Sequence, residues 1–112
     1  MYEVLEELNR TSGVTGSMVV GNDGIVIAAD LDTRYQDETV GALAASITAN
    51  VNKSLERLSE EKLSQLTIEA MNGKLFMASN EVGILVVTAE KNVNIGLIRL
   101  EIKHALAKIK IS

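Results

Sequence analysis

The longest regular alternation of apolar and polar positions in this chain runs from Glu38 to Leu58. Apolar side chains recur there at spacings of three and four residues, which is the period of one face of an α-helix. They are Val40, Leu43, Ala44, Ile47, Val51, Leu55 and Leu58. No helix-breaking residue follows Gly41, so the pattern predicts one helix of roughly 30 Å at ~1.5 Å per residue. We expect this apolar face to build the core of the chain's own fold.

The opposite face of this predicted helix carries small side chains where a surface helix normally carries charges. The stripe consists of Ala42, Ala45 and Ala49, and the polar residues Asn52, Lys53 and Glu56 continue it. Small side chains allow the backbone of a second helix to approach closely. The stripe therefore favours contact with another chain. The alternative is that another part of the same chain covers it.

Shorter patterns predict the remaining elements. Apolar residues on one side of residues 2–11, followed by Gly13, indicate a short first helix. A closing helix is expected to begin near Asn92 or Asn94, because apolar residues recur at helical spacing beyond that point. These apolar residues are Ile95, Ile98, Ile102, Ala105 and Ile109. Asp37 is the expected cap of the long helix.

Runs of apolar or alternating residues predict strands. They lie at Val14–Val20, Ile25–Ala29, Leu66–Met71, Lys74–Ser79 and Gly83–Ala89. Asp23-Gly24 and Asn72-Gly73 are typical of tight hairpin turns. We expect the first hairpin to be covered on both faces and the last strand to be central. The element order, with antiparallel neighbours joined by hairpins, predicts an α+β fold around a five-stranded sheet.

The strand from Leu66 to Met71 directly follows the long helix, which favours a place at the edge of the sheet. Only Glu69 would discourage another strand from pairing there, since the segment contains neither proline nor lysine. An interior position is the alternative. If the strand lies at the edge, one two-fold contact could pair it with its copy through Thr67 and Glu69 and pack the long helix against its copy. The sequence thus predicts a homodimer.

Length and composition narrow the class of protein. The 112 residues predict a single domain, 1–112, and 46% hydrophobic with 23% charged residues is an ordinary globular balance. Apolar runs are too short for a membrane span. The acidic N-terminus and the absence of cysteine favour a cytoplasmic protein. A net charge of −4 and 3% aromatic residues argue against nucleic acid as a partner.

The residue patterns of common catalytic and ligand sites are missing. The glycines do not form a phosphate-binding loop, because no lysine follows them at the required spacing. His104 is the only histidine, so neither a histidine metal cluster nor a clear catalytic triad can be assembled. Asp30 and Asp32 are better read as a solvated loop than as cation ligands. We therefore expect no catalytic residue, no cofactor and no metal site, and no enzyme.

Several blocks of the sequence resemble the Roadblock / dynein light chain family. They are Gly13 to Gly16 leading through Gly24 into Ile25 to Ala28, Gly41 to Ala45, Val82 to Val87, and Asn94 to Glu101. The resemblance covers nearly the whole chain and rests on packing patterns rather than on catalytic signatures. The short chain is similar to prokaryotic single-domain members.

The resemblance implies a profilin-like αββαβββα sandwich, with the long second helix on one face of the sheet and the terminal helices on the other. It also implies a homodimer through the third strand and the long helix, and a scaffold or regulatory role with a small Ras-like GTPase as partner. Stimulated GTP hydrolysis would act through the partner's switch regions, since no arginine is marked as a finger. A small-ligand sensory domain of profilin-like fold is the alternative.

Overall fold

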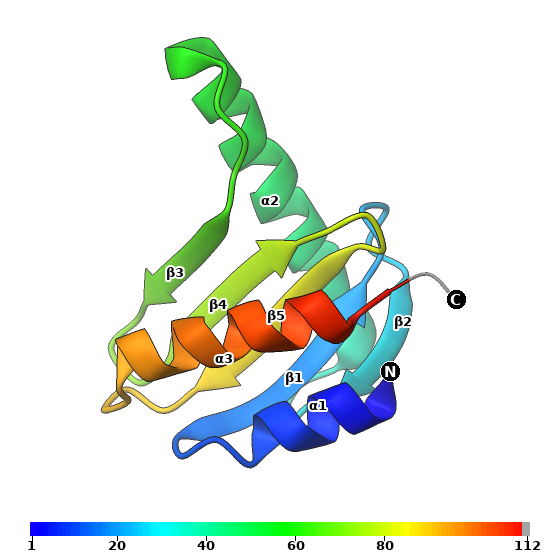
Figure 1. Cartoon of the computed structure of the whole chain (residues 1–112), viewed down its shortest axis with the longest axis vertical. Coiled ribbons are helices and arrows are strands. Elements are labelled where there is room, and N and C mark those ends of the chain that lie inside the picture. The colour runs from blue at the N-terminus through cyan, green and yellow to red at the C-terminus, as the bar shows by residue number, and fades with distance from the viewer. Residues whose placement is uncertain (111–112) are drawn as a thin grey trace.

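The computed structural model describes residues 1–110 and confirms the α+β architecture with three helices and five strands. The elements in chain order are α1 (Tyr2–Asn9), β1 (Val14–Val20), β2 (Val26–Asp30), α2 (Asp37–Ser59), β3 (Gln65–Glu69), β4 (Lys74–Ser79), β5 (Ile84–Ala89) and α3 (Ile95–Lys108). Figure 1 labels them along the chain. Asn94 caps α3, because its side-chain oxygen accepts a hydrogen bond from the backbone N–H of Leu97 at 3.0 Å.

The five strands form one antiparallel sheet in the order β2-β1-β5-β4-β3. β5 is central, and all six of its residues are buried, as the sequence predicted. β3 lies at one edge of the sheet, which confirms the favoured position for this strand. β2 forms the other edge.

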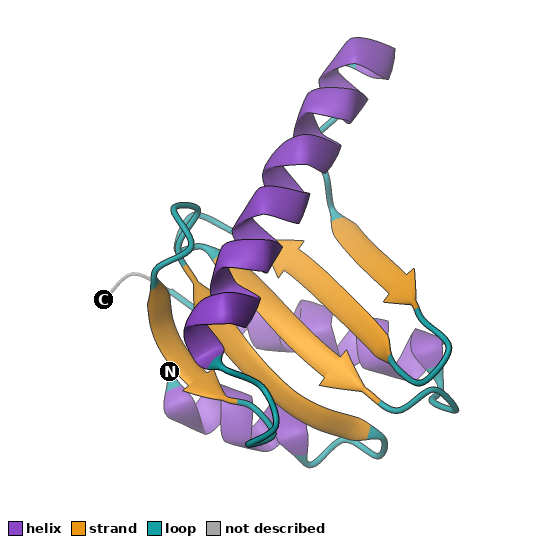
Figure 2. Cartoon of the chain, turned by 180° about the vertical axis from the view of Figure 1, so that it is seen from behind, coloured by secondary structure: helices purple, strands orange, loops and turns teal. Residues whose placement is uncertain are grey.

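Helices cover the two faces of the sheet unequally. α1 and α3 lie side by side on one face (Figure 1), and α2 crosses the other face alone (Figure 2). Neighbouring residues of β4 show the division: Phe76 packs in the core under α1 and α3, whereas Met77 packs in the core under α2. Both side chains are buried.

The expectation that the large apolar residues of α2 all build the chain's own core is wrong. The buried residues of α2 are Gly41, Ala44 and Thr48, whereas Leu43 is 57% exposed and Leu58 is 82% exposed. The helix approaches the β1–β2 turn closely at Gly41, where a Cβ atom would lie 2.9 Å from the carbonyl oxygen of Gly24. This close contact turns the helix so that small residues, and not the leucines, face the sheet.

Two further expectations need correction. β2 begins at Val26, and Ala28 is its one buried residue, so the first hairpin is not covered on both faces. Ile27 stays 44% exposed because β2 is an edge strand whose pairing with β1 is interrupted by a register shift beside Val20. Gln36, and not Asp37, is the residue before the first turn of α2, and it makes no side-chain capping hydrogen bond.

Candidate interaction site on the long helix and the β3 edge

A groove of about 1270 Å³ runs between the first half of α2 and the β3–β4 side of the sheet. The helix supplies Val40, Leu43 and Ile47 to one wall, and the β3–β4 turn with Leu75 of β4 supplies the other. Leu43 is exposed there, and Met71 at the rim is 91% exposed. The groove is therefore open to solvent and largely apolar along its helical wall.

The sheet beside this groove is only half covered. Leu66, Ile68 and Leu75 pack against the core under α2 but remain partly exposed. α2 lies mainly over β2, β1 and β5 and reaches β4 at Met77, whose sulfur lies 3.9 Å from the hydroxyl of Thr48, so β3 and the rest of β4 are covered less completely. Contiguous apolar side chains that a protein leaves exposed are typical of a surface that contacts another molecule.

The second half of α2 extends beyond the edge of the sheet (Figure 2). Leu58 in this protruding part is 82% exposed, and Val51 and Leu55 on the same side are half-buried. The helix thus presents an apolar stripe that its own chain covers only in part.

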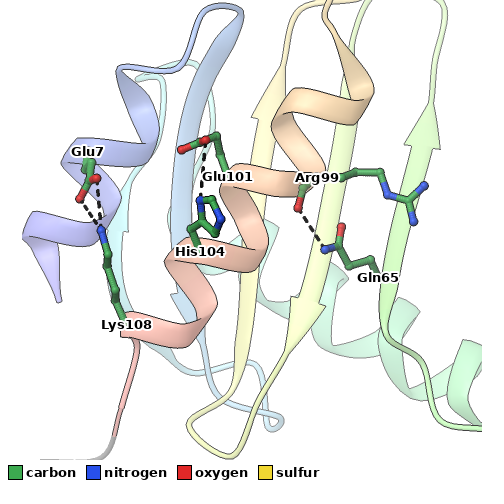
Figure 3. Close-up of polar contacts among 6 residues, drawn as sticks. All are labelled: Glu7, Gln65, Arg99, Glu101, His104 and Lys108. Atoms are coloured by element: carbon green, nitrogen blue, oxygen red, sulfur yellow. Dashed lines mark hydrogen bonds and ion pairs between the residues drawn. The ribbon is translucent and has the colours of Figure 1, made fainter.

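β3 pairs with β4 on one side only, so its other side leaves backbone N–H and C=O groups unpaired among the described residues. Thr67 is half-buried and Glu69 is exposed, 3.5 Å from the ammonium nitrogen of Lys74. Gln65 at the start of the strand donates a hydrogen bond to the backbone carbonyl of Arg99 in α3 at 3.2 Å (Figure 3). This edge has the backbone geometry to accept another strand.

The structure divides the predicted stripe of α2 into two groups. Ala42, Ala49, Lys53 and Glu56 are exposed on the side of the helix that faces away from the sheet.

Ala45 instead packs against the core under α2, close to Gly24 of the β1–β2 turn. The side-chain oxygen of Asn52 accepts a hydrogen bond from the backbone N–H of Leu63 at 3.0 Å, which ties the helix to the segment before β3. It stays a prediction that these residues, together with Thr67 and Glu69, take part in contacts between chains.

Sequence reasoning did not expect Leu43 and Leu58 to be exposed, or Ile47 to line an open groove. A signal for them exists in the sequence, because the apolar residues of α2 span a wider arc than one sheet contact can cover. Gly41 indicates which side of that arc touches the sheet, since a helix residue without a side chain permits the closest approach. The leucines on the far side of the arc then remain outside.

The described residues, 1–110, contain no group of three or more histidine, cysteine or acidic side chains placed to hold a metal ion. The side chain of His104 is 59% exposed, and its Nδ1 lies 3.9 Å from a carboxylate oxygen of Glu101 in the preceding turn (Figure 3). Nor does any helix in this part of the chain combine the length and apolar character that crossing a membrane requires. The open groove and the β3 edge are the candidate contact surfaces of this part of the chain.

Comparison with known proteins agrees with this architecture. The family model described as "Roadblock/LC7 domain" matches residues 1–89. The uncharacterized protein MJ0714 of Methanocaldococcus jannaschii is 46% identical over 107 residues, which cover 96% of this chain and 91% of that protein.

Two solved structures show the same fold. The Roadblock/LC7 domain from Streptomyces avermitilis has a TM-score of 0.89 at 18% identity, over 96% of this chain and 92% of that chain. MglB from Myxococcus xanthus has a TM-score of 0.87 at 21% identity, over 95% of this chain and 88% of that chain. The sequence match and the shared fold together show that this chain belongs to the Roadblock/LC7 domain family.

Proposed function

We propose that this chain is a homodimeric cytoplasmic scaffold that binds a small Ras-like GTPase. The observation that carries the proposal is the apolar surface of α2 and the adjoining sheet, which one copy leaves open. Leu43 and Leu58 are the clearest members of this surface, because both are more than half exposed. Membership of the Roadblock/LC7 family supports the proposal, since the family resemblance implies both the dimer and the GTPase.

In the proposed dimer, a two-fold axis passes beside β3. The β3 strands of the two copies pair in antiparallel fashion, which satisfies the free backbone groups at this edge and joins the two sheets. The α2 helices then cross the joined sheet side by side. The protruding half of each helix, with Leu55 and Leu58, enters the groove beside Leu43 of the other copy.

The same geometry explains why one copy leaves large side chains in water. Burying a leucine side chain is worth ~1.5 to 3 kcal/mol, and a two-fold contact repeats each burial. The gain is offset by the free energy lost in holding two chains together, so a few well-packed side chains decide whether the dimer forms. Leu43 and Leu58 are the residues we assign to that role.

The GTPase is proposed to bind across the outward faces of the two α2 helices. Ala42, Ala49, Lys53 and Glu56 remain exposed there when the apolar side of the helix enters the dimer. Small side chains make this face flat, and Lys53 and Glu56 provide polar contacts at its end. Four of the six helix residues that the sequence predicted as a contact surface thus keep that role. In this proposal they contact the GTPase rather than the second copy.

We further propose that the chain acts on its GTPase without donating a catalytic group. Two of the four arginines, Arg10 and Arg34, form ion pairs at the surface with Glu6 and Asp32, at 3.2 and 3.7 Å. A regulator of this kind changes GTP hydrolysis by favouring one arrangement of the partner's switch regions.

The test is binding of purified small Ras-like GTPases from the source organism, loaded with GDP or with a non-hydrolysable GTP analogue, measured by calorimetry. Wild-type protein should bind at least one of them with a preference for one nucleotide. The variant Ala49→Arg should weaken binding at least tenfold without changing the mass of the dimer. Absence of binding to every such GTPase in both nucleotide states contradicts the proposed function.

A further inference from the structure

One flank of α2 has an order of side chains that fits an antiparallel copy of itself. Leu43 and Leu58 are exposed at its two ends. Ile47 and Ser54 lie between them at helical spacing. Both pairs share one midpoint along the chain, between positions 50 and 51. A two-fold rotation about that midpoint therefore places each Leu43 beside Leu58 of the second copy and each Ile47 opposite Ser54 of the second copy.

Ser54 is suited to burial against another helix, although it is polar. Its hydroxyl donates a hydrogen bond to the backbone carbonyl of Asn50 at 3.0 Å, so its proton does not need water. Its side chain is small, whereas the side chain of Ile47 is large and lines the groove. Ile47 can therefore fill the space beside Ser54 of the second copy, which lets the two helices approach closely.

The centre of this flank lies where α2 crosses the edge of the sheet. The hydroxyl of Thr48 is 3.9 Å from the sulfur of Met77 in β4, and Met77 pairs with Leu66 of β3. One turn later, Asn52 accepts the hydrogen bond from the backbone N–H of Leu63, just before β3. This part of α2 thus passes over the start of β3, and the rest of the helix extends beyond the sheet (Figure 2). One two-fold axis can therefore relate both the two helices and the two β3 strands.

The length of β3 favours one register for its pairing with a copy. An antiparallel pair centred on Thr67 uses all five residues of the strand, Gln65–Glu69, whereas a shift in either direction leaves some of them without a partner. In this register Leu66 lies opposite Ile68 of the second copy. Both side chains are half-buried and pack against the core under α2, so the pair extends the apolar floor of the groove into the other sheet.

The same register brings opposite charges together on the α3 side of the sheet. Gln65 then lies opposite Glu69 of the second copy, and Gln65 is hydrogen-bonded to the backbone carbonyl of Arg99. Figure 3 shows the side chain of Arg99 extending from α3 toward β3. Arg99 is exposed and forms no ion pair within the described residues, 1–110. The side chain of Glu69 is 63% exposed and has one carboxylate oxygen near Lys74, which leaves its other oxygen for Arg99 of the second copy.

We propose that the two-fold axis of the dimer passes beside Thr67. Each Ile47 then packs on Ser54 of the second copy, and each Arg99 pairs with Glu69 of the second copy. This register presupposes the homodimer of the proposed function and adds the contacts that select a second copy of this chain as the partner. The order of side chains along α2, the length of β3 and the exposed guanidinium of Arg99 all lead to the same axis.

Cysteine cross-linking tests the helix contact, because the chain contains no cysteine of its own. The double variant Ile47→Cys with Ser54→Cys should become a covalent dimer on mild oxidation, measured by electrophoresis without reductant. Each single variant should give at least tenfold less covalent dimer. In a single variant the two cysteines are seven residues, or about 10.5 Å, apart along the helices, which exceeds the ~7 Å that a disulfide spans between Cα atoms.

The double variant Ser46→Cys with Lys53→Cys is the matched control. These two residues have the same separation along the helix and are exposed, but they lie outside the flank. The control should give no more covalent dimer than the single variants. Light scattering of wild-type protein separates two failures: a dimer without the Ile47–Ser54 cross-link overturns the register alone, whereas a monomer overturns the register and the proposed homodimer together.

Charge reversal tests the contact on the other face of the sheet. Arg99→Glu should raise the Kd of the dimer about tenfold at about 20 mM salt, because it places carboxylates of the two copies side by side. In a Glu69→Gln background the same reversal should change the Kd by less than about twofold, since the facing charge is gone. Lys103→Glu is the matched control, because Lys103 is an exposed cation of the same helix that lies beside Asn80 and Glu81 instead, and it should leave the Kd unchanged. Sedimentation measures the Kd, and an effect of Arg99→Glu that is equal in both backgrounds, or absent from both, overturns the proposed register.

Discussion

The two faces of the sheet differ in how completely the chain covers them. Under α1 and α3, thirteen hydrophobic residues in the described part of the chain are buried in one cluster, and both helices contribute large side chains to it. Under α2 the corresponding cluster has six, of which only Ala44 comes from the helix. The longest helix of the molecule therefore contributes least to the core of its own chain.

This difference separates what holds the monomer together from what is left for other molecules. Two short helices with leucine and isoleucine at their inner positions close one face. The other face is crossed by a helix that touches the sheet with Gly41, Ala44 and Thr48 and turns Leu43 outward. Most of the buried apolar side chains lie on the first face, and the exposed leucines of α2 lie on the second.

The largest expected effect is a loss of stability from a substitution under α1 and α3. Phe76→Ala should lower the free energy of unfolding by ~3 to 5 kcal/mol, because it opens a cavity in a fully covered core. Met77→Ala, one residue away on the half-covered face, should cost about 2 kcal/mol, since its surroundings can relax toward the groove. Urea unfolding of both variants checks this, and equal losses would contradict the contrast between the two faces.

The next effect concerns the groove. Leu43→Glu should weaken the dimer by at least ~2 kcal/mol, or about thirtyfold in Kd, because a charge replaces a side chain central to the proposed contact. Light scattering at high salt should show the mass fall from two chains to one. Ile25→Glu is the matched control, since Ile25 is 67% exposed near the far edge of the sheet and should leave the dimer intact. A Leu43→Glu protein that remains dimeric would remove the groove from the interface.

A smaller effect distinguishes two alanines of the same helix. Ala45→Glu should destabilise the folded chain by about 1 to 2 kcal/mol, because it places a carboxylate against the core beside Gly24. Ala49→Glu should change the stability by less than ~0.5 kcal/mol, because the side chain points to solvent. Urea unfolding measures both. If the two variants unfold alike, α2 is rotated differently from the arrangement described above.

The smallest effect is local. Asn52→Ala removes the acceptor for the backbone N–H of Leu63 and should cost ~1 kcal/mol. Hydrogen exchange at the amide of Leu63 should accelerate while exchange in β5 stays unchanged. Uniform acceleration throughout the sheet would instead mean that this hydrogen bond supports the whole fold.

Sequence patterns predicted most of the fold, for reasons visible at particular residues. The alternation around Lys74 to Ser79, the Asp23-Gly24 and Asn72-Gly73 turns and the helical stripe from Ile95 onward are local signals, because each depends on residues close together in the chain. The run of apolar residues from Ile84 to Val87 indicated that this strand lies at the centre of the sheet. The edge position of β3 followed from the helix that directly precedes it.

The candidate site was predicted less well than the fold. The sequence selected the long helix and the β3 edge, which the structure leaves open, but assigned the large apolar residues of α2 to the inside and the alanine stripe to the outside. Ala45 was expected outside but packs against the core, and Leu43 was expected inside but is exposed. Periodicity reports that a helix has an apolar side, but it does not report how that side is rotated against a neighbour.

The sequence by itself thus determined the order and type of the elements and the family, because these depend on periods and turns within short segments. The tertiary structure alone decided the rotation of α2 on the sheet, through the close contact of Gly41 with the β1–β2 turn. That contact joins residues of two different elements, and it fixes which apolar side chains of α2 are buried within the chain itself. Leu43 is exposed because this rotation turns it away from the sheet, and Leu58 is exposed because it lies where α2 extends beyond the sheet.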